Sequence, residues 1–146
     1  MSAYWDSSAL VEASLDEGIR LSLAKEGGFT RTHSFAEVFS TLTGGRLGFR
    51  SQAEDAAKIC REIADDLECV ELSLQETLAA LDKARRHGVR GGHIHDFLHV
   101  VAARKAGADK IYTLTLMIFG VFVRVSKSRF HRSFERKGSR RGWRPR

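Results

Sequence analysis

The chain has 146 residues, enough for one domain with a real hydrophobic core. Its formal net charge of +6 is unevenly distributed: residues 124–146 hold ten lysines and arginines and one acid, whereas residues 1–123 sum to −3. The positive net charge of the whole chain therefore comes from residues 124–146, and residues 1–123 are mildly acidic. Residues 1–18 lack the features of a signal peptide, and the longest apolar run, 116–123, is far below the roughly 20 residues of a membrane span. We expect a cytoplasmic protein with no membrane partner.

The first part of the chain alternates between strand and helix signals. A short strand over 3–5 stops at Asp6, and a helix begins at Ser7. A second helix over 17–25 ends at two glycines, and 29–33 is typical of a strand. An acid that ends a strand at a helix start lies on the rim of a sheet. It can also be a plain helix N-cap, for which Asp is a preferred residue.

Three later helix starts share the capping-box pattern, in which a serine is followed three residues later by a glutamate. The pairs are Ser34 with Glu37, Ser51 with Glu54, and Ser73 with Glu76. Locally, Glu37 cannot be distinguished from the other two glutamates. A strand is expected over 69–72, and a helix that carries Leu74, Leu78 and Leu81 follows it.

The stretch from 91 to 115 contains the most informative helix. Its apolar residues Ile94, Phe97, Leu98 and Val101 have helical spacing, and its polar residues gather at the two ends. Asp96 lies in the first turn, opposite the apolar stripe. Acids are favoured there by the helix dipole, but a buried carboxylate also requires solvent, a cation or a metal. A strand over 111–114 follows.

Alternating strands and helices with long connections predict a three-layer α/β/α fold around a central parallel sheet. Ligands of such folds bind outside the carboxyl ends of the strands. Asp6 follows the first strand, Glu37 lies on the helix after the second, and Asp96 begins the helix before the fourth. If these ends converge, three carboxylates face one cleft. They would repel one another unless a cation neutralises them, and Mg²⁺ or Mn²⁺ is the natural occupant, with phosphodiester hydrolysis as the chemistry that follows.

These motifs, in this order, resemble a PIN domain, and within that family the VapC-like toxin ribonucleases of bacterial toxin-antitoxin pairs. The matching pieces are Asp6-Ser7-Ser8-Ala9-Leu10, Phe35-Ala36-Glu37-Val38, Gly92-x-Ile94-x-Asp96, the segment 103–109, and Thr113-Leu114-Thr115. The resemblance covers 3–119.

The resemblance implies a PIN-like nuclease domain over 1–123, with Asp6, Glu37 and Asp96 as catalytic, metal-binding acids. Ser8 would be a supporting polar contact in the same cleft. It further implies Mg²⁺ or Mn²⁺ as cofactor, RNA as substrate, a cognate antitoxin and a homodimer.

The chain departs from the family after Leu114. The family continues T-L-N-x-x-D-F, but Thr115 replaces the Asn and Ile118 replaces the Asp. The family-like codons AAC CTT GAT GAT TTT C become ACC TTG ATG ATT TTC when one A is lost, which encodes the Thr-Leu-Met-Ile-Phe found here. We hypothesise a one-base deletion, which also accounts for the basic tail. A gene that reads cleanly through codon 115, with relatives sharing the tail, would contradict it.

The tail over 124–146 has two interpretations. Its basic residues with Phe130, Phe134 and Trp143 could bind RNA through phosphate contacts and stacking. Its composition also predicts a disordered segment, which is the interpretation that we favour.

Two other functions compete with the ribonuclease. His95 and His99 flank Asp96 as in an H-E-x-x-H zinc hydrolase helix, with His33 or His93 as a third ligand. The missing fourth acid favours a catalytically inactive module that binds antitoxin or RNA. Metal dependence separates the three functions. The ribonuclease requires Mg²⁺ or Mn²⁺, the zinc hydrolase requires Zn²⁺, and the inactive module shows no metal-dependent turnover.

Overall fold

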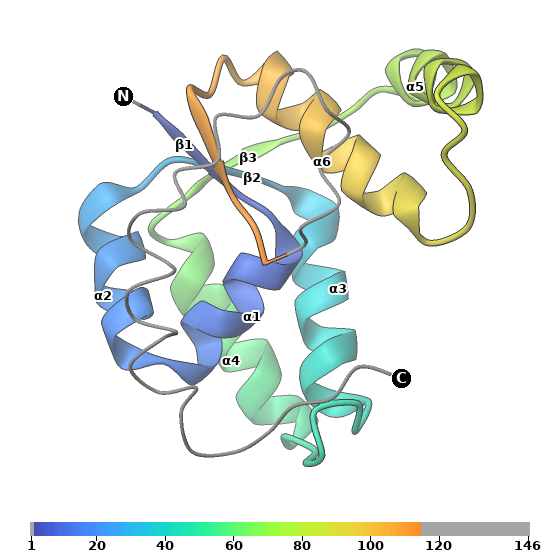
Figure 1. Ribbon diagram of the computed structural model, residues 1–146. Coiled ribbons are helices and arrows are strands. Elements are labelled where there is room, and N and C mark those ends of the chain that lie inside the picture. The colour runs from blue at the N-terminus through green and yellow to red at the C-terminus, as the bar shows by residue number, and fades with distance from the viewer. Residues whose placement is uncertain (1, 115–146) are drawn as a thin grey trace.

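The computed structural model describes residues 2–114 (Figure 1). Strands and helices alternate along most of this part of the chain. In chain order the elements are β1 (Ala3–Trp5), α1 (Ser7–Leu15), α2 (Glu17–Glu26), β2 (Phe29–Arg31), α3 (Thr32–Thr43), α4 (Ala53–Ala64), β3 (Glu68–Val70), α5 (Leu74–Arg86), α6 (His93–Lys105) and β4 (Lys110–Tyr112).

The strands form one sheet in the order β3-β2-β1-β4, and every pair in the described residues is parallel. Tyr4 at the centre of β1 is in register with Phe29 on one side and Ile111 on the other. Helices connect the successive strands, as parallel pairing requires. The predicted α/β fold with a central parallel sheet is confirmed.

The alternation of side chains along β1 divides the core into two layers. Ala3 and Trp5 pack with α1, α2, α3 and α4 on one face, whereas Tyr4 packs with Ala102 and Ala103 of α6 on the other. Figure 1 shows the first four helices on one side of the sheet and α6 on the other, with α5 packed against α6. The result is a three-layer α/β/α arrangement.

Two of the three predicted capping boxes are wrong. Only Ser73 caps its helix, because its side chain accepts from the backbone N–H of Glu76 while the Glu76 carboxylate accepts from the backbone N–H of Ser73. Ser34 lies inside α3, buried, where its hydroxyl is hydrogen-bonded to the Thr30 hydroxyl at 2.9 Å. Ser51 lies before the N-cap residue of α4, Gln52, which makes no side-chain cap. The motif occurs by chance at both positions.

Helix α5 carries its leucines on the outside. Leu74, Leu78 and Leu81 are 73%, 53% and 42% exposed, whereas Ala80 and Ala84 form the buried face. The apolar stripe therefore predicted the helix but not the side that packs.

Several predictions fall on residues that the structure does not describe. They are the fourth polar position at Thr115 and Ile118, the tail over 124–146 and the hypothesised frame change after Leu114. Between residues 2 and 114, no helix is long and apolar enough to cross a membrane.

Candidate metal centre

The three predicted acids lie near the carboxyl edge of the sheet. Asp6 follows β1 directly, Glu37 stands in the second turn of α3 after β2, and Asp96 stands in the first turn of α6, which leads back into β4. Because the strands are parallel, their ends and the starts of the following helices gather at one edge.

Asp6 is 4% exposed and caps α1. Its Oδ1 accepts hydrogen bonds from the Ala9 backbone N–H at 2.9 Å and from the Ser8 hydroxyl at 2.6 Å. No hydrogen bond from the described residues ends on Oδ2. Oδ1 of Asp6 therefore caps the helix, as the N-cap interpretation expects, and Oδ2 takes no part in the cap.

Ser8 links Asp6 to the end of the last strand. Its Oγ donates to Asp6 and accepts from the Leu114 backbone N–H at 2.9 Å, and it lies 3.5 Å from the Thr113 hydroxyl. The supporting contact expected of Ser8 is thus a contact with Asp6, which fixes the carboxylate against the β4 end.

Glu37 is held by a set of neighbours that the sequence did not reveal. Oε2 accepts from the Ser7 hydroxyl, and His99 Nε2 lies 3.5 Å from the same oxygen. Oε1 is buried and accepts no hydrogen bond from any residue between 2 and 114, with His33 Nε2 at 3.8 Å. Burial alone would raise the pKa of Glu37, but its contacts with His99, Ser7 and His33 prevail and lower the pKa to about 2. Glu37 is therefore a carboxylate at any physiological pH.

His99 connects Glu37 to the centre of the sheet. It is 2% exposed, and its Nδ1 lies 2.8 Å from the Tyr4 hydroxyl. Burial raises the pKa of Tyr4, so the hydroxyl stays protonated and can act as the hydrogen-bond donor to Nδ1. Nε2 then carries the ring hydrogen toward Glu37, which as a carboxylate only accepts. His95 and Asp96 lie one turn earlier on the same helix face, so no local pattern singled out His99 for this contact.

Asp96 stands in a different electrostatic setting. Its side chain is 32% exposed, and His93 Nδ1 lies 3.7 Å from Oδ2. Burial, followed by the negative charge of Asp6, raises the pKa of Asp96. The two aspartates thus lie close enough to repel each other, which is the condition that a bound cation relieves.

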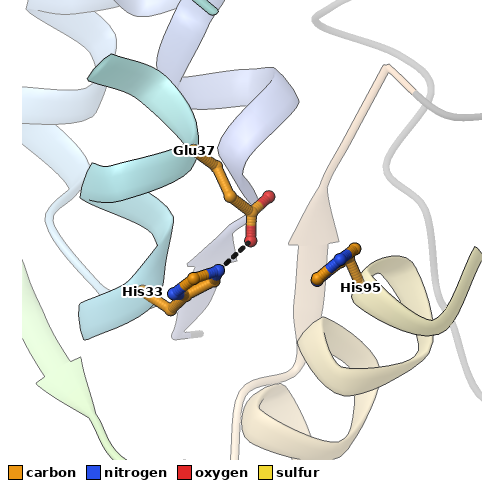
Figure 2. A group of neighbouring side chains, drawn as sticks. All are labelled: His33, Glu37 and His95. Atoms are coloured by element: carbon orange, nitrogen blue, oxygen red, sulfur yellow. Dashed lines mark ion pairs between the residues drawn. The ribbon is translucent and has the colours of Figure 1, made fainter. Parts of the chain in front are cut away.

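The tightest group of ligand side chains in the described residues is a mixed one. Ligand atoms of His33, Glu37 and His95 all lie within 4.8 Å of one another, and no other group of three meets this spacing between residues 2 and 114. Figure 2 shows the two imidazoles on either side of the space below the Glu37 carboxylate. Asp6 and Asp96 are outside this group. His99 is outside it too, so the structure separates the two histidines of the predicted zinc motif.

No known protein family matches the chain, and no curated protein does. The resemblance to PIN domains therefore stays a prediction that rests on the order and spacing of the motifs in this sequence.

Proposed function

We propose that this protein is a metal-dependent endoribonuclease of the PIN type that hydrolyses RNA phosphodiester bonds. Asp6, Glu37 and Asp96 are its proposed metal-binding acids. The observation that supports this most is the gathering of carboxylates at the sheet edge, where burial, followed by the negative charge of Asp6, raises the pKa of Asp96 while Glu37 stays ionised. Such an edge gains stability by binding a cation.

The donor set suits a hard divalent ion. Asp6 has an oxygen that accepts no hydrogen bond from the described residues, Glu37 has the buried oxygen Oε1 without one, and Asp96 adds a half-buried carboxylate. Oxygen ligands that leave room for water are the preference of Mg²⁺ and Mn²⁺. When bound, such an ion helps to deprotonate a water and stabilises charge on the leaving oxygen.

The surrounding residues position these acids. Ser7 and His99 hold Glu37 ionised with one oxygen turned away from them, and Tyr4 fixes the tautomer of His99. Ser8 fixes Asp6. In this proposal their role is orientation: they keep carboxylate oxygens available at the edge before any cation or RNA phosphate arrives.

The biological setting in this proposal is that of a toxin. It includes a cognate antitoxin, a homodimer and a cytoplasmic RNA target, all of which rest on the resemblance. The second candidate function is an inactive module that binds antitoxin or RNA. Thr115 and Ile118 favour it, because neither can supply the fourth carboxamide or carboxylate of the site.

The test is single-turnover cleavage of a panel of labelled, structured RNAs with Mn²⁺, Mg²⁺ or EDTA. We expect cleavage that EDTA abolishes and that Asp6→Asn slows by about 100-fold or more, the scale on which one electrostatic group acts. Asp82→Asn, which makes the same change at an exposed position 72% open to solvent, is the control and should cleave normally.

A repaired variant distinguishes the two candidates. It carries Thr115→Asn, Met117→Asp and Ile118→Asp. If only this variant cleaves, the metal site stands and the natural chain is a disabled nuclease that acts by binding. If neither protein cleaves any RNA with either metal, the ribonuclease proposal fails.

A further inference from the structure

We propose that His33, Glu37 and His95 form a second kind of metal site, which binds a borderline divalent ion such as Zn²⁺. We also infer that an ion held there withdraws Glu37 from the acidic site. The first half stands on the geometry of the three side chains. The second half rests on the proposed nuclease function.

The three ligands come from two helix starts that face each other. His33 and Glu37 are one turn apart on the same face of α3, and His95 belongs to the first turn of α6. The two imidazole rings are nearly parallel, at 17°, with centroids 6.0 Å apart. Figure 2 shows the two rings on either side of the Glu37 carboxylate, with His33 and Glu37 from one helix and His95 from the other.

The spacing requires only a small adjustment to hold an ion. The ligand atoms lie within 4.8 Å of one another. Zinc binds imidazole nitrogen and carboxylate oxygen at about 2.0–2.2 Å, so donors around one ion are separated by roughly 3–4 Å. Both histidines are exposed, His33 with 53% of its side chain open to solvent. Rotation of their side chains can therefore bring the ligand atoms to the shorter separations that a bound ion requires.

The ligand types select the ion. Two imidazoles and one carboxylate suit Zn²⁺ and its neighbours, whereas Mg²⁺ prefers oxygen and water. His99 does not belong to this set, because Tyr4 and Glu37 occupy its two nitrogens. Three protein ligands leave a fourth position for water.

Glu37 Oε1 is the point of conflict between the two sites. Oε2 is engaged by Ser7 and His99, and Oε1 is the buried oxygen that no hydrogen bond from the described residues satisfies. The acidic site and the histidine site therefore draw on the same oxygen. An ion of the Zn²⁺ class that takes it acts as an inhibitor of Mg²⁺- or Mn²⁺-dependent cleavage.

The binding test uses the full-length chain, stripped of metal with EDTA and dialysed under reducing conditions. Co²⁺, a coloured substitute for Zn²⁺, is titrated while visible absorption is followed, and Zn²⁺ is then added to displace it. We expect one equivalent to bind, and His33→Ala and His95→Ala each to weaken binding by at least about tenfold. His87→Ala changes the C-cap histidine of α5, which is not one of the three ligands; it is the control and should bind like the natural chain.

Circular dichroism of each variant establishes that it is folded. Equal binding by all the proteins, or a thiolate-to-cobalt absorption band from Cys60 or Cys69, would overturn the site. So would the absence of binding to the natural chain.

The cleavage assay tests the inhibitory half separately. Zn²⁺ should suppress Mn²⁺-dependent cleavage by the natural chain and leave His95→Ala largely unaffected. Equal inhibition of both proteins would overturn the competition for Glu37. If no RNA is cleaved under any condition, the nuclease proposal and the inhibitory half fail together, while a histidine-dependent Co²⁺ spectrum still supports the binding site.

Discussion

At the scale of single residues, Glu37 and Asp96 occupy the same edge of the sheet but respond to it in opposite ways. Glu37 has hydrogen-bond donors that lower its pKa to about 2. Asp96 has burial and the charge of Asp6, which raise its pKa. The protein therefore stabilises the charged form of Glu37, whereas it destabilises the charged form of Asp96.

This destabilisation makes Asp96→Asn a stabilising change at neutral pH. A carboxyl whose folded pKa is raised destabilises the fold once the pH exceeds its ordinary unfolded pKa of about 3.9, and it costs nothing when both states are protonated. We expect a higher melting temperature for Asp96→Asn at pH 7 without added metal, and no gain at about pH 3. Thermal unfolding followed by circular dichroism measures both.

The exposed Asp82→Asn should change stability by less than about 0.5 kcal/mol at either pH. If Asp96→Asn proved destabilising at pH 7, the repulsion between Asp6 and Asp96 would not govern this edge.

Sequence order was sufficient to place Asp6, Glu37 and Asp96 near one edge, because parallel strands bring their carboxyl ends together. It could not identify the partners of Glu37. Ser7 is 30 residues away along the chain, and the Tyr4 to His99 contact spans 95 residues. Such contacts depend on how α3 and α6 pack, which local pattern does not encode.

At the scale of elements, every predicted strand and helix of the described part exists, but several boundaries differ. The strands expected over 29–33, 69–72 and 111–114 are each three residues long, over 29–31, 68–70 and 110–112. Thr32 and His33 already belong to α3, so β2 is cut short by the helix that follows it. The competition between ladder pairing and helix start is decided by tertiary packing.

The capping motifs give a direct test of this point. Ser73→Ala removes a complete capping box and should cost about 1 kcal/mol of unfolding free energy. Ser51→Ala changes the same motif where no cap is formed and should cost less than about 0.5 kcal/mol. Urea denaturation of the two variants beside the natural chain measures the difference, and equal losses would mean that Ser51 caps α4 in solution.

At the scale of the whole molecule, the sheet depends on how closely its strands approach at Gly28. This residue has φ +117°, and a Cβ there would lie 2.2 Å from the Ala3 carbonyl oxygen. Its own carbonyl accepts a hydrogen bond from the Glu68 backbone N–H. One glycine therefore lies where β1, β2 and β3 come together, and no side chain fits.

Gly28→Ala should destabilise the protein by clearly more than about 1 kcal/mol, because both the backbone conformation and the contact with Ala3 are forbidden to alanine. Gly92→Ala is the matched control: its φ of −62° is ordinary and a Cβ there meets nothing within 4 Å. Soluble yield and melting temperature distinguish them. A Gly28→Ala protein as stable as the control would mean that the strands separate more easily than this packing allows.

The pairing of β1 with both β2 and β4 has a consequence for protein synthesis. Strand β1 leaves the ribosome first, but one of its two partners, Lys110–Tyr112, is made more than 100 residues later. Asp96 likewise follows Asp6 by 90 residues. A nascent chain therefore carries Asp6 and Glu37 without Asp96 for much of its translation. If the protein is the ribonuclease proposed here, it cannot cut the message that encodes it until nearly all of the described domain has emerged.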